Sequence, residues 1–407
     1  MAEKKKTPAI RFKGFTDVWE QRKLGELGSI VTGSTPSTQV SEYYSDTGIP
    51  WVTPTDISEN ITFDTVKKLS EKGQQVGRVV PPNTILVTCI ASIGKNTMLG
   101  IAGSFNQQIN GLTPNEDKYN PYFLFTESTL WSAKMKRSAA AGTMQIVNRT
   151  EFSEQKTILP SLLEQQQIGD FFRNLDRLIT LHQRKYEKLQ NIKKSCLEKM
   201  FPKTGCNVPE IRFKGFTDAW EQRKLGEISD KVTEKNAGLQ YVETFTNSAE
   251  FGVISQRDFF DHSISKIDNL EGYYIVRSED FVYNPRISAT APVGPVNRNK
   301  LGRNGVMSPL YTVFRPHDVD NTYLEHFFKS RYWHAYMNFN GDSGARSDRF
   351  SIKDELFFQM PIPTPHIEEQ QKIGAFLTSL DDLITLHQRE LEKLQNLKKA
   401  CLEKMFV

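Results

Sequence analysis

Cysteine and long apolar runs are scarce in this 407-residue sequence. Its four cysteines form no CxxC pair, so we expect neither a disulfide framework nor a zinc site, and a reducing cytoplasm fits this composition. No run of 18 apolar residues occurs, which argues against a membrane-spanning helix. Residues 1–7 are basic but lack an apolar core, so they do not read as a secretory signal.

Catalytic motifs and a strong excess of one charge are missing as well. The net charge is only +4, which is weak support for nucleic-acid binding. Gly94-Lys95 lacks the remainder of a P-loop. Asn120-Pro121-Tyr122-Phe123 is similar to an amino-methyltransferase signature but lacks its second proline, and we expect it to begin a helix. No dinucleotide, nuclease or helicase motif stands out, so we expect no catalysis, metal site or cofactor in this chain.

An internal repeat is the strongest positive signal. Residues 8–26 recur at 209–227 with 17 of 19 positions identical. Residues 164–201 recur at 369–406 with 28 of 38 positions identical. The segments between them barely resemble each other. Identical ends around unlike middles indicate one task performed twice with two specificities.

The longer repeat predicts a helix of about 37 residues, or roughly 55 Å. Apolar residues follow spacings of four and three through both copies, with Lys193 and Lys398 interrupting the seam. Such a heptad pattern needs a partner helix, and two equivalent elements related by a twofold axis pack antiparallel. We therefore expect the two helices to pack on each other.

The unlike middle segments predict mixed α/β domains, with short apolar strands, polar loops, and helices at 119–142 and 321–336. We expect one apolar face on each helix, formed by Leu124, Trp131 and Met135 on the first and by Leu324, Phe328, Tyr332 and Ala335 on the second. The expected fold is α+β: two mixed α/β domains separated by two antiparallel coiled-coil helices, with a pseudo-twofold repeat. The expected boundaries are 1–27 and 204–227 for the repeat segments, 28–158 and 228–363 for the domains, and 159–203 and 364–407 for the helices.

Several motifs give this organisation a family resemblance. They are IPWVTPTDI at 49–57, ASIGK at 91–95, FNQQINGLTP at 105–114, and the helix starts EQQQIGDFF at 164–172 and EEQQKIGAFL at 368–377. Together with the duplication, they resemble the specificity subunits of type I restriction-modification systems over essentially the whole chain. The second domain departs from the pattern, because it lacks FNQQI and has Ser255-Gln256-Arg257-Asp258 in place of Thr53-Pro54-Thr55-Asp56.

The resemblance implies that each domain reads one half of a bipartite, asymmetric site on double-stranded DNA. It also implies two methyltransferase subunits docked on the repeats, and restriction subunits that join them. S-adenosylmethionine, ATP and Mg would then belong to those partners. A coiled-coil adaptor that binds only proteins is the main alternative, and an orphan methyltransferase is a weaker one.

Candidate DNA contacts are the loop residues with amide, hydroxyl, carboxylate or cationic side chains that read base edges and phosphates. In the first domain they are Thr53, Thr55, Asp56, Ser92, Lys95, Asn106, Gln107 and Gln108. In the second domain they are Gln256, Arg257, Arg286, Asn297, Arg298, Arg303, Asn304, Ser308, Arg346 and Arg349. An ordinary loop hydrogen bond is the alternative for each.

Candidate partner contacts are the aromatic residues of the shorter repeat, because aromatic residues dominate interface cores. They are Phe12, Phe15, Trp19, Phe213, Phe216 and Trp220. The alternative is that these side chains cover the helix ends inside the chain.

Overall fold

The computed structural model describes residues 7–407 apart from residues 91, 141–145, 204, 261–266 and 343–347. The chain divides into two compact units: unit 1 comprises residues 1–184 and 388–407, and unit 2 comprises residues 185–387. Within the described ranges, no helix has the length and apolar character needed to cross a membrane.

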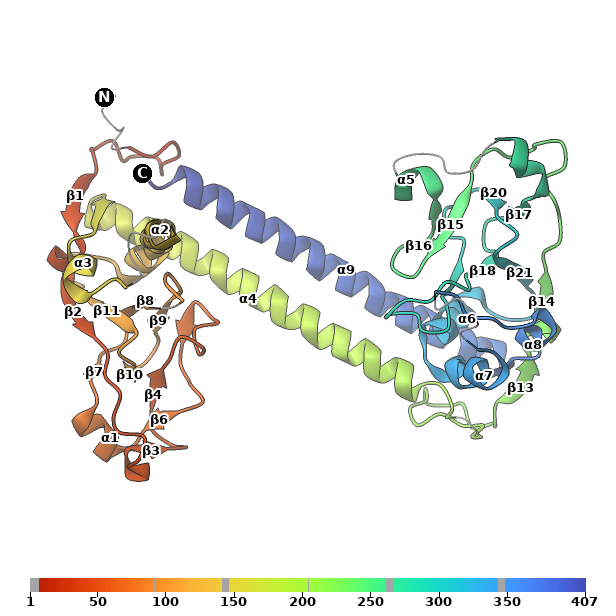
Figure 1. Cartoon of the computed structure of the whole chain (residues 1–407), viewed down its shortest axis with the longest axis horizontal. Helices are drawn as coiled ribbons and strands as arrows, with labels where there is room; N and C mark the ends of the chain where they lie inside the picture. The colour runs from red at the N-terminus through yellow and green to blue at the C-terminus, as the bar shows by residue number, and fades with distance from the viewer. Residues whose placement is uncertain (1–6, 91, 141–145, 204, 261–266, 343–347) are drawn as a thin grey trace. The chain divides into compact units, whose positions relative to one another are not determined.

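Unit 1 is built on two five-stranded sheets (Figure 1). The first has the order β2-β11-β8-β9-β5 and comprises Gly28–Thr32, Ile109–Pro114, Ile85–Thr88, Asn96–Leu99 and Ile61–Thr62. The second has the order β3-β6-β4-β10-β7 and comprises Tyr44–Ser45, Lys68–Leu69, Ile49–Val52, Gly103–Phe105 and Val79–Val80. All four residues of β8 are buried, as expected for a central strand covered on both faces.

Unit 2 repeats the central part of this topology. Its four-stranded sheet has the order β14-β21-β18-β19, which comprises Ser229–Lys231, Thr312–Pro316, Phe281–Tyr283 and Val296–Arg298. In both units these four strands pair antiparallel throughout. The two domains therefore share one sheet order although their sequences barely resemble each other.

Two-stranded sheets complete each unit. In unit 1, β1 (Glu20–Lys23) pairs with β12 (Lys156–Leu159). In unit 2, β13 pairs with β22, β15 with β16, and β17 with β20; these strands are Glu221–Lys224, Pro361–Thr364, Phe245–Ser248, Gly252–Ser255, Tyr274–Val276 and Gly305–Met307. The β1–β12 and β13–β22 pairs join each short repeat to the strand before a long helix.

Each unit also contains short helices, of which η1 and η3, and α3 and α8, occupy equivalent places in the element order. In unit 1 they are α1 (Glu71–Val76), α3 (Arg149–Ser153), η1 (Leu24–Glu26) and η2 (Ser41–Tyr43). In unit 2 they are α5 (Gln256–Phe260), α8 (Asp354–Phe358), η3 (Leu225–Glu227) and η4 (Ile267–Gly272). The helices α3 and α8 each precede the last strand of their domain.

The helix expected at 119–142 is α2 (Pro121–Ala140), and its predicted apolar face, Leu124, Trp131 and Met135, is buried. The helix expected at 321–336 is interrupted. It consists of α6 (Asn321–Lys329) and α7 (Tyr332–Asn340), because Ser330 leaves the helical conformation with a ψ of 171°. The prediction that Ala335 shares the buried face of Leu324 is therefore wrong, and Ala335 is exposed.

The long helices are α4 (Leu162–Lys199) and α9 (Ile367–Lys404). Within unit 1, Phe172 near the start of α4 packs on Phe406 just beyond α9, and Asp176 pairs with Lys398. Residue numbers thus rise on α4 as they fall on α9, so the segments of unit 1 run antiparallel. Within unit 2, Lys193 pairs with Asp381 at the equivalent repeat positions.

Glycine in the longer repeat permits a close helix contact. A Cβ atom on Gly169 would lie 2.4 Å from Oδ1 of Asn120, at the start of α2. A Cβ atom on Gly374 would lie 3.0 Å from the backbone nitrogen of Tyr323, in the first turn of α6. Each long helix therefore seats directly on the start of its domain's helix.

Candidate nucleic-acid interface

Three loops of unit 1 meet at one edge of its sheets. Strands β4 and β10 pair in parallel, so the loops that follow them leave side by side. Asn106 donates its backbone N–H to the carbonyl of Val52 at 3.0 Å, and Cys89, after β8, donates to the carbonyl of Gln108 at 2.8 Å. The fold therefore gathers loops 53–57, 89–95 and 106–108, which carry all eight first-domain candidates.

The loop after β4 is held by Asp56. Its Oδ2 accepts the backbone N–H of Thr53 at 2.8 Å and the Thr53 hydroxyl at 2.5 Å. The hydroxyl oxygens of Thr53 and Thr55 lie 2.8 Å apart, and Thr55 is exposed. Asp56 and Thr53 thus fix the loop, while Thr55 faces solvent.

The loop after β10 likewise has residues that hold its conformation and one residue that is exposed to solvent. Asn106 accepts the Gln108 backbone N–H at its Oδ1 (3.0 Å) and donates from Nδ2 to the Gln108 side chain (3.2 Å). Gln107, between them, is exposed and accepts the hydroxyl of Thr35. An exposed amide held at the tip of a short turn suits recognition of a base edge.

Lys95 connects two of these loops. Its Nζ lies 3.3 Å from the carbonyl oxygen of Pro54, and its backbone N–H donates to the Thr88 hydroxyl at 2.9 Å. Thr88 also donates that hydroxyl to the carbonyl of Ser92. Lys95 and Ser92 are both exposed, so this edge presents a cation beside polar groups.

Four second-domain candidates are engaged inside unit 2. Arg303 forms two 2.7 Å bonds with Glu243, and Asn304 accepts the Ser278 backbone N–H at 3.1 Å. Gln256 is 8% exposed. These contacts stabilise the domain, and the assignment of Gln256, Arg303 and Asn304 as base contacts stays a prediction.

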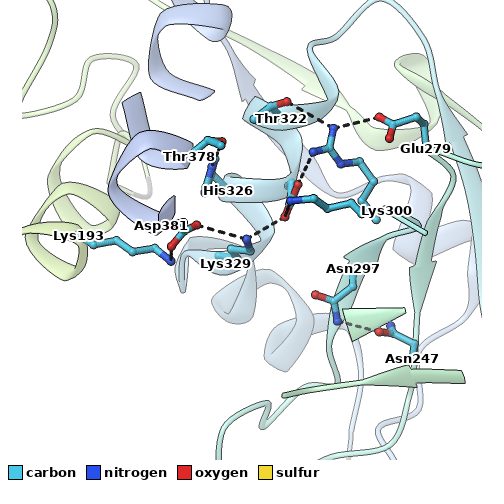
Figure 2. A network of polar contacts seen from close by, with 12 residues as sticks. Lys193, Asn247, Glu279, Asn297, Lys300, Thr322, His326, Lys329, Thr378 and Asp381 are labelled. Carbon is cyan, nitrogen blue, oxygen red and sulfur yellow. Dashed lines mark hydrogen bonds and ion pairs between the residues drawn. The ribbon is translucent and has the colours of Figure 1, made fainter. Parts of the chain in front are cut away.

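Arg298 is the fourth engaged residue, and its partner Glu279 is labelled in the polar network of Figure 2. Its guanidinium lies 2.6 Å from Glu325 on α6 and 3.0 Å from Glu279, and its side chain is 10% exposed. Glu325 also forms ion pairs with Lys300 and Lys329. Arg298 thus attaches β19 to α6, and its assignment as a DNA contact stays a prediction.

The other second-domain candidates gather partly around two asparagines that the sequence did not single out. Asn297 donates to Oδ1 of Asn247 at 2.7 Å (Figure 2), and Asn284 donates to the Asn247 carbonyl at 2.7 Å. Asn284 accepts the backbone N–H of Arg286 at 2.9 Å, and Arg286 forms a β-bridge with Arg349. Asn284 directly follows the apolar strand β18, which was an available signal in the sequence, whereas Asn247 lies within the largely polar strand β15 and had no such signal.

The remaining candidates have separate positions. Arg257 is exposed on α5, and Ser308 is partly exposed after β20. Arg346 lies outside the described residues. Among the described residues, no group of three or more histidine, cysteine or acidic side chains has an arrangement suited to a metal ion.

The partner prediction for the tryptophans is wrong. Trp19 is 1% exposed and contacts Phe123 and Phe406, and Trp220 is 2% exposed and contacts Tyr323. The chain itself therefore covers both indoles, as the internal alternative proposed.

The four phenylalanines remain partly exposed. Phe12 packs edge-on against Phe171, and Phe213 packs the same way against Phe376. Phe15 and Phe216 keep part of their surface for a partner, so their assignment stays a prediction.

Each unit contains the same buried ion pair, which links its copy of the shorter repeat to its copy of the longer repeat. Arg11 binds the fully buried carboxylate of Glu164 through two bonds of 2.6 and 2.8 Å. Arg212 binds Glu369 in the same way at 2.7 and 2.8 Å. Hydrogen bonding to these carboxylates, the largest effect, raises the pKa of both arginines. Much of the sequence repeat therefore serves internal attachment.

The next repeat residue bridges helix starts in each unit. Gln165 accepts the Asn120 backbone N–H at 3.0 Å and donates to the Pro160 carbonyl at 2.9 Å. Gln370 makes the equivalent bonds with Asp320 and Pro365 at 2.9 and 2.7 Å. These paired bonds place each domain helix against the start of a long helix.

The comparisons with known proteins agree with this duplicated architecture. A family model described as "Type I restriction modification DNA specificity domain" matches residues 16–191 and 217–396. The type I restriction enzyme MjaVIII specificity subunit of Methanocaldococcus jannaschii is 23% identical over 406 residues, covering 94% of this chain and 90% of that protein. The HindI specificity subunit of Haemophilus influenzae is 30% identical over 148 residues, covering 35% of this chain and 32% of that protein.

The fold has a solved counterpart. The S subunit of a type I restriction-modification system from M. genitalium superposes with a TM-score of 0.57 at 12% identity, covering 98% of this chain and 99% of that one. The chain belongs to the family of type I restriction-modification DNA specificity subunits. This assignment favours sequence recognition over a purely protein-binding adaptor.

Proposed function

We propose that each domain reads one half of a bipartite, asymmetric DNA site, and that the chain supplies the address without catalysing a reaction. The observation that carries this proposal is one sheet order, β2-β11-β8-β9 and β14-β21-β18-β19, surrounded by unlike loops. A common scaffold positions loops, and different loop side chains select different bases.

The edge formed by loops 53–57, 89–95 and 106–108 binds the first half-site. Thr55 and Gln107 are its exposed reading groups, Lys95 contacts phosphate, and Thr53, Asp56, Asn106 and Gln108 hold the loops. The second half-site falls to Arg286, Asn297 and Arg349, with Asn247 and Asn284 as their supports. Arg257 and Ser308 remain further proposed contacts.

The partners and location follow from the family. Two methyltransferase subunits dock on the repeats, restriction subunits join them, and S-adenosylmethionine, ATP and Mg are bound by those subunits. The assembly acts in the cytoplasm. The domains that exchange as modules are 28–158 and 228–363, flanked by the repeat segments 1–27 and 204–227 and the helices 159–203 and 364–407.

Domain exchange tests the central proposal. Replacing residues 228–363 by the corresponding domain of another specificity subunit should change one half of the methylated sequence and preserve the other. The measurement is mapping of modified adenines after assembly with the methyltransferase subunits. The unmodified chain and an exchange of 28–158, which should alter the opposite half, are the controls. Alteration of both halves by either exchange would contradict independent reading.

A further inference from the structure

The interrupted helix of unit 2 leaves two adjoining hollows along α7. The first, of about 780 Å³, lies among α4, α7 and α9 and is lined in part by Leu197, Tyr332 and Ile384. The second, of about 630 Å³, is lined in part by Cys206, Tyr336 and Phe339. Both include Lys203, Tyr332 and Ala335, so the two hollows form one continuous surface, which we call the α7 surface.

One face of α7 supplies the apolar part of this surface. Tyr332, Ala335, Tyr336 and Phe339 recur at the three- and four-residue spacing that aligns side chains on one helix face. Phe339 is 89% exposed, and a phenylalanine so exposed beside two further aromatic residues marks an interaction surface rather than ordinary surface variation.

The lining geometry favours a helix as occupant. The α4 residues at the first hollow, Gln190, Lys193, Lys194 and Leu197, also follow three- and four-residue spacings. A trough between helices whose walls carry ridges of this spacing accepts another amphipathic helix. A DNA backbone fits less well, because aliphatic and aromatic side chains line much of the surface and phosphates gain nothing from them.

The charges at the rim specify the sign of that helix. Lys193 pairs with Asp381, Lys329 pairs with Glu325 at 2.8 Å and lies 3.7 Å from Asp381, and Lys203 pairs with Glu210. Lys194 and Arg331 are exposed and, among the contacts of the described residues, form no ion pair. Glu198 at the same rim offsets one of these two cations, and the remaining excess of positive charge favours carboxylates flanking the apolar face of a partner helix.

In the part of unit 1 that the structure describes, α2 presents no equivalent of this aromatic face. The corresponding part of α2 continues without a break, and its Trp131 and Met135 point inward with 2% exposure each. The Lys-Lys pair of α4 does recur in α9, as Lys398-Lys399. The aromatic face of the α7 surface therefore comes from the variable domain and, within the described ranges, is found in unit 2 alone, whereas the α4 and α9 walls belong to the repeated helices.

We propose that the α7 surface binds one acidic amphipathic helix of a protein subunit from the same restriction-modification system, one contact per chain. The identity of the partner rests on the proposed function, but the surface itself does not read DNA. A variant of this surface should therefore lose the partner while retaining the sequence specificity of the remaining complex.

The thiol of Cys206 provides a probe within the surface. It is exposed, whereas Cys89 and Cys196 are buried. The experiment measures the rate of Cys206 alkylation by N-ethylmaleimide in the full chain, alone and after addition of the purified methyltransferase or restriction subunit. We expect one of these proteins to slow the reaction at least tenfold at saturation.

A charge-reversing double variant, Arg331→Glu with Phe339→Glu, tests the contact. Both side chains are exposed, so the unfolding midpoint should stay unchanged while the partner's Kd rises at least tenfold and the alkylation rate returns to that of the free chain. Phe63→Glu, at a 59% exposed phenylalanine of unit 1, is the matched control and should change neither quantity.

Several results would overturn the proposal. They are protection of Cys206 by neither protein, protection by duplex DNA alone, protection by self-association of the chain, or full protection retained in the double variant. A change in the methylated sequence, with partner binding intact, would instead assign the surface to DNA reading. If domain exchange fails to alter specificity but Cys206 is protected as expected, the proposed function fails while this contact stands.

Discussion

Glu127 on α2 is a buried carboxyl group whose ionisation opposes folding. Burial is the main cause that raises its pKa to about 7, and hydrogen bonding from Thr157 only partly offsets it. The unfolded carboxyl ionises near pH 4.5, so the folded state binds the proton more tightly between these values. Stability therefore falls as pH rises from about 4.5 to 7 and remains lower above 7.

Glu127→Gln should remove this cost. At pH 8 we expect the variant to be more stable by up to about 3 kcal/mol, the free energy equivalent of the pKa shift, and at pH 4.5 nearly equal to the original chain. Thermal unfolding midpoints at the two pH values provide the measurement, with the exposed Glu59→Gln as control. An equal effect of Glu127→Gln at both pH values would rule out the ionisation argument.

His326 on α6 shows the opposite dependence. Burial, assisted by Lys329, lowers its pKa to about 3, while Nε2 lies 3.1 Å from the Thr378 hydroxyl (Figure 2). The imidazole is thus neutral in the fold, whereas the unfolded side chain takes up a proton below about pH 6.5. Stability contributed by the neutral state is complete above 6.5 and is lost as pH falls toward 3.

His326→Thr should reduce this acid sensitivity, because a threonine side chain does not take up a proton in this pH range. Threonine is chosen because it stands at the equivalent position, Thr126, in unit 1. Between pH 7 and pH 5 we expect the original chain to lose about 2 kcal/mol more than the variant. Denaturant titrations at both pH values measure the difference. The exposed His366→Thr is the control, and a variant that loses stability as steeply as the original chain would contradict the assignment.

At the scale of elements, the sequence predicted both long helices but did not explain why a lysine interrupts the apolar seam of each one. Lys193 and Lys398 interrupt a heptad seam, and the apolar periodicity by itself indicates only that these two positions do not fit the pattern. The structure pairs them with Asp381 and Asp176, at equivalent positions of the opposite helix. A contact between residues about 190 to 220 positions apart leaves no local pattern, so the sequence could not predict these ion pairs.

The lack of a local sequence pattern also explains why the break between α6 and α7, and the internal contacts of some DNA-contact candidates, could not be predicted. Helical periodicity continues through Ser330, and only the packed structure shows that the chain turns there. The loop candidates of the first domain were predictable because their polar residues directly follow apolar strands. Arg298 and Arg303 look identical to free arginines in the sequence, because their partners Glu325 and Glu243 come from distant segments.

The two inter-helix ion pairs should differ in strength. Asp176 has a side chain only 7% exposed, and it also accepts the Tyr122 hydroxyl at 2.9 Å. Lys398→Met would leave this carboxylate largely buried without its cation, which costs about 2–4 kcal/mol. Asp381 is 30% exposed and retains Lys329 at 3.7 Å, so Lys193→Met should cost less than about 1 kcal/mol.

Chemical denaturation of the two single variants measures this difference. Adding Asp176→Asn to Lys398→Met should recover most of the lost stability, because the uncompensated charge is removed. Equal losses in the two lysine variants, or no recovery in the double variant, would argue against a role for burial.

At the scale of the whole molecule, the duplication has two separable consequences. Repeated residues such as Arg11 and Arg212, or Gln165 and Gln370, make the same contacts inside each unit. Other repeated residues remain exposed despite their apolar character. Leu178 and Leu383 are 45% and 40% exposed, and Leu181 and Leu386 are 45% and 52% exposed. Internal attachment explains the first group, and for the second group we propose a partner surface present in two copies.

Two methyltransferase subunits should therefore bind one chain, each through one copy of the exposed leucines. The substitutions Leu178→Glu and Leu383→Glu place a charge on an apolar contact, so each single variant should retain one methyltransferase subunit and the double variant none. Mass measurement of the assembled complexes, with this 46.6 kDa chain as the constant component, gives the stoichiometry. Glu substitution at Val66, which is 91% exposed in unit 1, is the control and should leave two copies bound. A single methyltransferase subunit on the original chain would contradict the symmetric arrangement, and two copies on the double variant would move the contact away from these leucines.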